Sequence, residues 1–162
     1  METQLTVNDS TATIPADEVL FNEAMHITGV TEYGISFEDL MAGAVALPPQ
    51  GARFDVAYEG AIEGAKLKGY LKGIDYVRVT PDGRFQLNIH ATVETDDGER
   101  IAVTSGGILK APDPVTGIAQ VRLNMQFVAA SSQYEWMNAL QAWGAGTVNL
   151  QTREINVTIY SA

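Results

Sequence analysis

The chain has 162 residues, 20 of them acidic and 10 basic, and its formal net charge at neutral pH is -10. This length is enough for one domain with its own core, and the negative charge argues against binding to nucleic acid or to an anionic membrane surface. The chain has no cysteine, which excludes disulfides and thiolate chemistry and is typical of a reducing compartment.

The first part of the chain differs in composition from the rest. Residues 1–17 are polar and are interrupted by Pro15, so we expect a flexible N-terminal arm followed by a single domain over residues 18–162. This beginning lacks the basic and apolar regions of a signal peptide, and no apolar run approaches the roughly 20 residues that span a bilayer. We therefore expect a soluble, cytoplasmic protein.

The segment before the double proline at 48–49 is ambiguous. Residues 18–27 fit a strand or a short helix, because their apolar residues follow neither period well. Ser36 is followed three residues later by Asp39, which predicts a short helix within residues 34–47.

From residue 53 onward apolar and polar residues alternate, which is typical of half-buried strands. Turns are marked by Pro81-Asp82-Gly83 and Asp96-Asp97-Gly98. The predicted strands cover residues 53–59, 65–72, 74–80, 85–94, 100–105, 120–129 and 154–160.

One more short helix is predicted near the C-terminus. Ser132 and Glu135 have the spacing of a capping box, and the helix would run from Tyr134 to about Ala142. Seven or eight strands in a meander would leave two open edges, and closure into a barrel removes them. The sequence thus predicts an all-β protein, an antiparallel and roughly eight-stranded barrel of the lipocalin or allene-oxide-cyclase kind. Its interior would be filled by side chains or would hold one small ligand.

The sequence leaves open which face of the sheet lines the barrel. The polar face of strand 85–94 carries Asn88 and His90, and that of strand 120–129 carries Arg122 and Asn124. In one interpretation the apolar faces fill the barrel and the polar faces meet water. In the other the polar faces line a pocket, since amides and an imidazole are easier to desolvate than ions. The outward apolar faces would then be covered by a second subunit or by the N-terminal segment, and we would expect a homo-oligomer.

Several short motifs, in this order and spacing, resemble the small bacterial and fungal barrel proteins of domain-of-unknown-function family 3237. They are Glu59-Gly60, Leu67-Lys68-Gly69, Asp75-Tyr76, Pro81-Asp82-Gly83, Thr95-Asp96-Asp97-Gly98 and Tyr134-Glu135-Trp136-Met137-Asn138. The resemblance covers roughly residues 50–162 and implies an antiparallel barrel with a polar pocket, without a settled activity. This chain departs from the family pattern at residues 72–76 (Lys-Gly-Ile-Asp-Tyr), at His90, where the family usually has an arginine, and at Asn88.

Three residues are candidates for catalysis. His90 is the only histidine in the family-like region, and imidazole is suited to general acid or base chemistry near neutrality. Asp75 would act as a base if burial raised its pKa, and Arg122 would stabilise a developing anion. Each also has a structural explanation: a hydrogen-bonded strand histidine, a turn or salt-bridge aspartate and a surface ion pair.

Amide and aromatic side chains are candidates for substrate binding, because they could donate hydrogen bonds or shape a pocket. Packing of a helix onto the barrel is the alternative role for Trp136. The candidates are Asn88, Asn124, Tyr70, Tyr76, Tyr134 and Trp136.

No cofactor and no metal are expected. The chain has two histidines, His26 and His90, far apart in sequence, and it has no glycine-rich phosphate loop that opens a helix. We therefore predict a cofactor-independent barrel enzyme that moves protons on a small organic molecule, as an isomerase, cyclase or lyase. The alternatives are a protein that binds a small ligand without turnover and a structural subunit whose barrel is filled.

Overall fold

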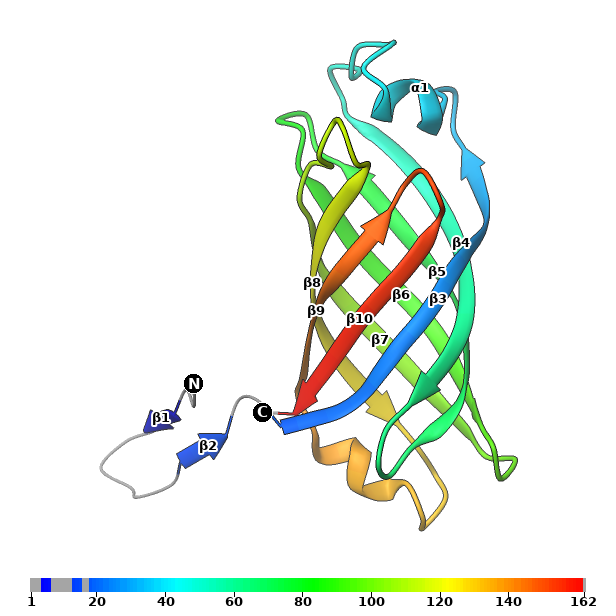
Figure 1. Cartoon of the computed structure of the whole chain (residues 1–162), viewed down its shortest axis with the longest axis vertical. Helices are drawn as coiled ribbons and strands as arrows, with labels where there is room; N and C mark the ends of the chain where they lie inside the picture. Colours follow the sequence, from blue (N-terminus) through cyan, green and yellow to red (C-terminus); the bar gives the residue numbers. More distant parts are fainter. Residues whose placement is uncertain (1–3, 7–12, 16–17, 162) are drawn as a thin grey trace.

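The computed structural model describes residues 4–6, 13–15 and 18–161. Eight antiparallel strands close into a barrel in the order β10-β3-β4-β5-β6-β7-β8-β9 (Figure 1), which confirms the predicted fold. Two short strands, β1 (Gln4–Thr6) and β2 (Thr13–Pro15), pair with each other, and the rest of the predicted N-terminal arm lies outside the described residues. The barrel strands are β3 (Glu18–Glu32), β4 (Ala52–Glu63), β5 (Lys68–Val79), β6 (Phe85–Thr95), β7 (Arg100–Leu109), β8 (Ile118–Val128), β9 (Ala142–Asn149) and β10 (Glu154–Ser161).

The barrel closes through a strand that the sequence did not predict. β9 pairs with both β8 and β10, and it begins at Ala142, where the sequence predicts the end of a helix. A side chain at Gly146 would place its Cβ 2.1 Å from the carbonyl oxygen of Asn156. Glycine therefore permits a close approach of β9 to β10 here. Glycines within a strand also make that strand harder to recognise from the sequence.

Both predicted helices are present, but only one is capped as expected. In α1 (Phe37–Met41) the Ser36 hydroxyl accepts from the backbone N–H of Asp39 at 3.2 Å. The second is a 3-10 helix, η1 (Glu135–Ala139), which begins after Tyr134 and has no side-chain cap, so the predicted capping box is wrong. Neither of these described helices is long and apolar enough to cross a membrane.

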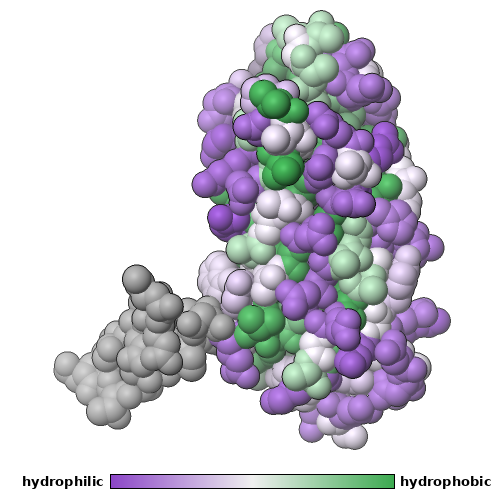
Figure 2. Space-filling view, viewed as in Figure 1, coloured by the Kyte–Doolittle hydropathy of each residue, from purple (hydrophilic) through white to green (hydrophobic). Residues whose placement is uncertain are grey.

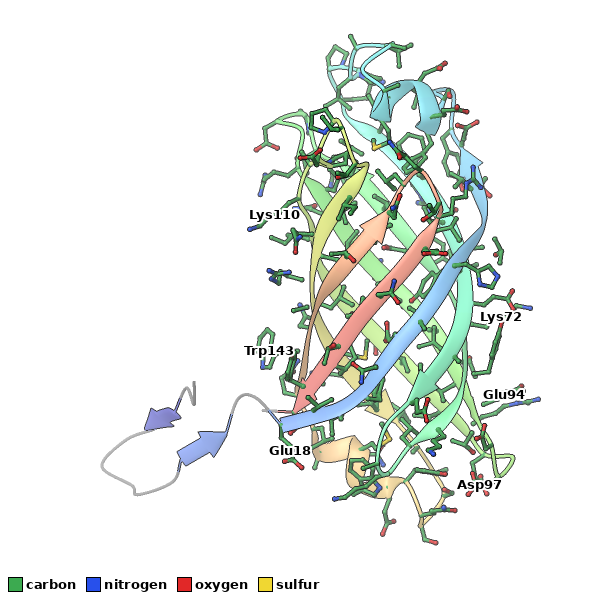
Figure 3. All side chains as sticks on the ribbon, in the orientation of Figure 1. Glu18, Lys72, Glu94, Asp97, Lys110 and Trp143 are labelled. Atoms are coloured by element: carbon green, nitrogen blue, oxygen red, sulfur yellow. The ribbon has the colours of Figure 1, made fainter. Side chains whose placement is uncertain are left out.

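The apolar faces of the strands point into the barrel. On β6 the inward residues from Phe85 to Val93 are buried, and they alternate with exposed polar residues. The first of the two interpretations of the sheet faces is therefore the one observed. The face seen in Figure 2 is largely hydrophilic with scattered apolar residues, and in Figure 3 Lys72 and Glu94 point away from the barrel.

The two ends of the barrel are covered differently (Figure 1). At one end η1 buries Met137 completely, and the Tyr134 hydroxyl donates to Asp97 at 2.8 Å. At the other end α1 has no buried residue. There the Phe37 ring packs edge-on against the Phe54 ring, with centroids 5.0 Å apart. The η1 end is thus firmly closed, and the α1 end has the lighter cover.

Asn138 fastens η1 to the barrel, and its removal should destabilise the protein. Its side chain donates to the Ala129 carbonyl and accepts from the Ala129 N–H, both at 2.7 Å. We expect Asn138→Ala to lower the free energy of unfolding in urea by about 1–3 kcal/mol, because two backbone groups lose their partner. The matched change Asn156→Ala, at an exposed position of β10, should cost less than about 0.5 kcal/mol. Equal losses in the two variants would contradict this role.

Candidate functional site

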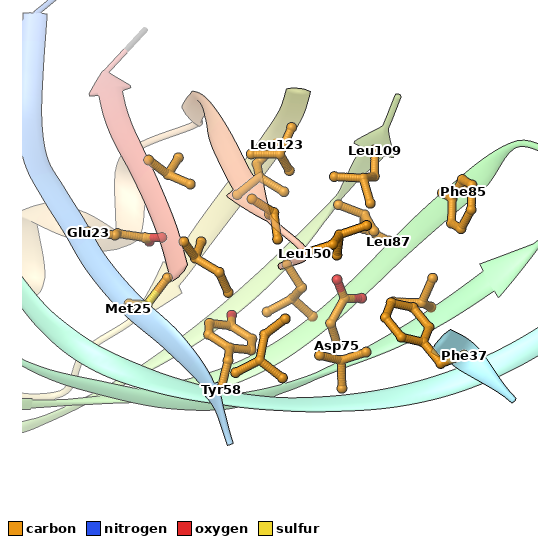
Figure 4. A pocket seen from close by; sticks show the side chains of 18 residues that line it. Glu23, Met25, Phe37, Tyr58, Asp75, Phe85, Leu87, Leu109, Leu123 and Leu150 are labelled. Atoms are coloured by element: carbon orange, nitrogen blue, oxygen red, sulfur yellow. The ribbon is translucent and has the colours of Figure 1, made fainter. Parts of the chain in front are cut away.

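The barrel encloses a cavity of about 80 Å³. Most of the side chains that line it are apolar, and they come from all around the barrel (Figure 4). Three lining residues carry polar groups: Glu23 on β3, Tyr58 on β4 and Asp75 on β5. These strands are neighbours in the barrel, so the polar groups share one part of its wall.

Glu23 occupies an inward position between two buried apolar residues, Phe21 and Met25. Within the described part of the chain its Oε1 atom is buried and has no hydrogen-bond partner. Burial disfavours the charged form and raises the pKa of Glu23 from 4.5 to about 8. At neutral pH this residue is therefore a carboxylic acid that can donate a proton or a hydrogen bond into the cavity.

Asp75 interrupts the pairing between β5 and β6. Paired residues run as far as Asp75 with Ile89, and pairing resumes at Arg78 with Gln86. In this gap the backbone N–H of Asn88 donates to Oδ1 of Asp75 at 3.0 Å. The Asp75 carboxyl thus accepts a hydrogen bond from the backbone of the neighbouring strand, and this hydrogen bond fixes the carboxyl on the cavity wall.

The same hydrogen bond helps to make Asp75 more acidic than Glu23. Burial raises the pKa of Asp75 from 3.8 to about 7, while the hydrogen bond from Asn88 acts in the opposite direction by stabilising the charged form. Near neutral pH both forms of Asp75 are populated. Its carboxylate can accept a proton under conditions in which Glu23 still holds one.

Tyr58 completes the polar group, and Figure 4 shows its hydroxyl pointing into the interior. Burial raises its pKa well above 10, and the nearby Glu23 and Asp75 carboxyls raise it further. The phenol therefore stays neutral and can donate a hydrogen bond. A base, an acid and a neutral donor in one apolar cavity is an arrangement suited to general acid–base chemistry.

A larger hollow of about 790 Å³ lies at the α1 end of the barrel. It shares Ile27, Phe37, Phe85 and Leu150 with the wall of the cavity. Residues of α1, such as Leu40 and Met41, line its outer part. The hollow and the cavity therefore share part of their walls at the lightly covered end.

Of the three residues predicted for catalysis, only Asp75 faces the cavity. His90 lies on the exposed face of β6, where its ring meets the Tyr76 ring edge-on at 5.9 Å. Arg122 lies on the exposed face of β8 and donates to the Val121 carbonyl at 2.8 Å. The structure does not bring these three together in the barrel interior.

The predicted binding residues also lie outside the cavity wall. Asn88 and Asn124 are exposed on β6 and β8, while the Tyr70 hydroxyl donates to Glu59 at 2.7 Å. Tyr134 and Trp136 belong to the η1 end, where the Trp136 indole donates to the Gln133 carbonyl at 3.0 Å. Roles for these residues in catalysis or binding remain predictions.

Sequence reasoning missed Glu23 and Tyr58. Both stand at positions where every second residue is apolar: Phe21 and Met25 flank Glu23, and Phe54 and Val56 precede Tyr58. An acid within an inward apolar series is the signal that could have found Glu23. Among the described residues no group of three or more His, Asp or Glu side chains could hold a metal ion.

Comparisons with solved structures agree with this architecture. A β-barrel-like protein from Acinetobacter baumannii is 22% identical with a TM-score of 0.70, over 90% of this chain and 94% of that one. A protein of unknown function from Clostridium acetobutylicum is 20% identical with a TM-score of 0.71, over 89% and 96%. A protein from Penicillium herquei described as an enzyme is 21% identical with a TM-score of 0.61, over 94% and 99%.

No curated protein matches the chain. Residues 50–162 match the family described as "Protein of unknown function (DUF3237)". This range begins just before β4 and contains all the barrel strands except β3. With its closed barrel and the motifs already noted, the chain belongs to the DUF3237 family.

Proposed function

We propose that this protein is an enzyme that catalyses proton transfer on a small organic molecule inside the barrel, as an isomerase, cyclase or lyase. The observation that carries the proposal is the set of two carboxyls and one phenol in a single apolar cavity. Titratable groups whose pKa values are pushed into the neutral range by burial are typical of acid–base catalysis. The similar fold of the Penicillium herquei protein described as an enzyme supports a catalytic role.

The roles follow from the protonation states. The Asp75 carboxylate removes a proton from carbon, and the electron pair of the broken C–H bond moves into the substrate. Glu23, as a carboxylic acid, and Tyr58, as a phenol, donate to the atom on which negative charge develops. In an isomerisation, Asp75 then returns its proton to another atom of the substrate. In an elimination, Glu23 and Tyr58 assist the departure of a leaving group.

The test is exchange of carbon-bound hydrogen in D2O, followed by NMR over a panel of small weak carbon acids. We expect the protein to accelerate exchange of at least one member. The rate should rise as pH passes through about 7, where Asp75 ionises, and fall above about 8, where Glu23 loses its proton. Flat pH dependence of an accelerated exchange, or no acceleration over the panel, would contradict the proposal.

His90→Ala distinguishes this interior site from a site on the outer wall. His90 lies on the exposed face of β6, so we expect the exchange rate of the variant to stay within about twofold of wild type. The melting temperature should change little, since exposed substitutions cost about 0.5 kcal/mol or less. A loss of exchange with the fold intact would instead support the catalytic role predicted for His90 from the sequence.

A binding protein without turnover is the second candidate. It is favoured by the small cavity volume of about 80 Å³, because a barrel interior that is mostly filled leaves little room for a substrate to rearrange. Such a protein would retain a small ligand through purification, would show it as extra mass in a native mass spectrum, and would release it chemically unchanged.

A further inference from the structure

The cavity wall restricts the charge of the molecule that it accepts. Among the described residues that line the cavity, none is lysine, arginine or histidine, and the ionisable groups are Glu23, Tyr58 and Asp75. An anionic ligand would find no positive partner there and would be repelled by the Asp75 carboxylate. Transfer of an unpaired charge into an apolar interior costs several kcal/mol or more. The part of the ligand that enters the cavity is therefore not an anion.

Glu23 shows what kind of group the ligand carries. Its side chain is buried, its Oε1 is without a partner in the described chain, and it points into the cavity (Figure 4). Buried polar atoms in folded proteins are nearly always paired, so an orphaned one at a cavity wall points to a partner that arrives with the ligand. A protonated carboxyl and the Tyr58 phenol are both donors, and the group that accepts from two donors is an oxygen.

The volume indicates how the ligand lies. An apolar cavity of about 150 Å³ is known to hold a benzene ring, and this cavity measures only about 80 Å³. Only the reacting end of a ring-sized molecule fits beside the carboxyls. The remainder lies in the hollow of about 790 Å³ at the α1 end, whose wall includes the apolar residues Phe37, Leu40 and Met41 and also the charged residues Glu38, Asp113 and Arg153.

From these observations we infer that the substrate is a neutral carbonyl compound with an apolar body, bound oxygen first through the α1 end, with its oxygen on Glu23 and Tyr58. This inference rests on the proposed function and names the substrate class of the same site. Asp75 takes a proton from the carbon next to the carbonyl, and the C–H electron pair forms a C=C bond. The carbonyl π electrons move to the oxygen, which receives the hydrogen bonds of Glu23 and Tyr58. Protonation of carbon by Asp75 restores the carbonyl and regenerates the carboxylate.

The experiment measures binding alone, by 19F NMR, with four probes of similar size. 4-Fluorophenol imitates the enol, fluorobenzene lacks the oxygen, 4-fluorobenzoate is an anion and 4-fluorobenzylammonium is a cation. We expect 4-fluorophenol to bind about tenfold more tightly than fluorobenzene, which is the order of effect of one net hydrogen bond, and both ions to bind more weakly than fluorobenzene. In Glu23→Leu the advantage of the phenol should disappear, while the affinity for fluorobenzene stays within about threefold.

Tyr58→Phe provides the same comparison with a smaller change, because it removes only the hydroxyl. It should lower the affinity for 4-fluorophenol and leave that for fluorobenzene unchanged. Equal affinities of the phenol and fluorobenzene in the wild type, tighter binding of either ion, or no binding of 4-fluorophenol at millimolar concentration would each overturn the inference. Tighter binding of the benzylammonium would identify an amine ligand instead.

The outcome is separable from that of the proposed function. Selective binding of 4-fluorophenol without any exchange of carbon-bound hydrogen would keep the ligand class and refute catalysis. Accelerated exchange without selectivity for the phenol would keep the catalyst and refute oxygen recognition by Glu23 and Tyr58.

Discussion

Asp75→Asn should lower the rate of carbon–deuterium exchange by about 10²- to 10⁴-fold, which is the usual contribution of a positioned general base. The amide has the same shape as the carboxyl and can still accept the hydrogen bond that the Asn88 N–H gives at 3.0 Å, but it cannot take a proton from carbon. The cavity should therefore keep its form, and the affinity for 4-fluorophenol should stay within about threefold of wild type.

The control for this substitution is Asp96→Asn, which makes the same chemical change at an exposed turn position. We expect its exchange rate to equal that of the wild type within about twofold. Exchange should be measured from pH 5 to 9 for all three proteins, since a base of altered pKa would move the rising limb whereas loss of the base removes it. An Asp75→Asn protein with the wild-type rate and pH profile would show that another group accepts the proton.

The sequence predicted the barrel because its strands and turns carry local signals. Strand 85–95 alternates without interruption, and both turns that flank it have glycine at a positive φ, 85° at Gly83 and 92° at Gly98. At the second turn the Thr95 hydroxyl accepts from the backbone N–H of Glu99 at 2.8 Å. Most of the motifs that resemble the family are such turns or the η1 closure, and these report the fold. Only the motif Asp75-Tyr76 includes a residue of the cavity wall.

The cavity could not be predicted in the same way, because it depends on strand register around the closed barrel. Glu23 and Asp75 are far apart in the chain and lie on strands separated by β4, so only the closed sheet brings them to one cavity. The polar face around His90 was the more visible feature of the sequence, yet its side chains point outward. A single acidic residue at an inward position is a weaker sequence pattern than that polar face, but it is the pattern that identifies the buried carboxyls.

The two buried carboxyls should also make the protein less stable as the pH rises from about 4 to 8. Their folded pKa values, about 8 for Glu23 and about 7 for Asp75, lie above the ordinary values of 4.5 and 3.8. Below the ordinary values both states of the protein hold these protons, and the full stability is present. As the pH rises the unfolded chain releases them first, so the free energy of unfolding falls until the folded protein ionises as well.

At about 1.4 kcal/mol for each unit of pKa difference, each carboxyl would account for a loss of up to about 4 kcal/mol between pH 4 and 8. Urea denaturation at intervals from pH 4 to 9 measures this slope. In Glu23→Gln one contribution is removed, so the variant should lose less stability over the same range and should exceed the wild type at pH 9. Other carboxyls whose pKa is lowered, such as Asp82 and Asp113, act in the opposite direction but mainly below pH 4, outside this window. Parallel pH profiles for wild type and Glu23→Gln would show that Glu23 does not remain protonated in the folded barrel, and the acid assigned to the site would have to be another group.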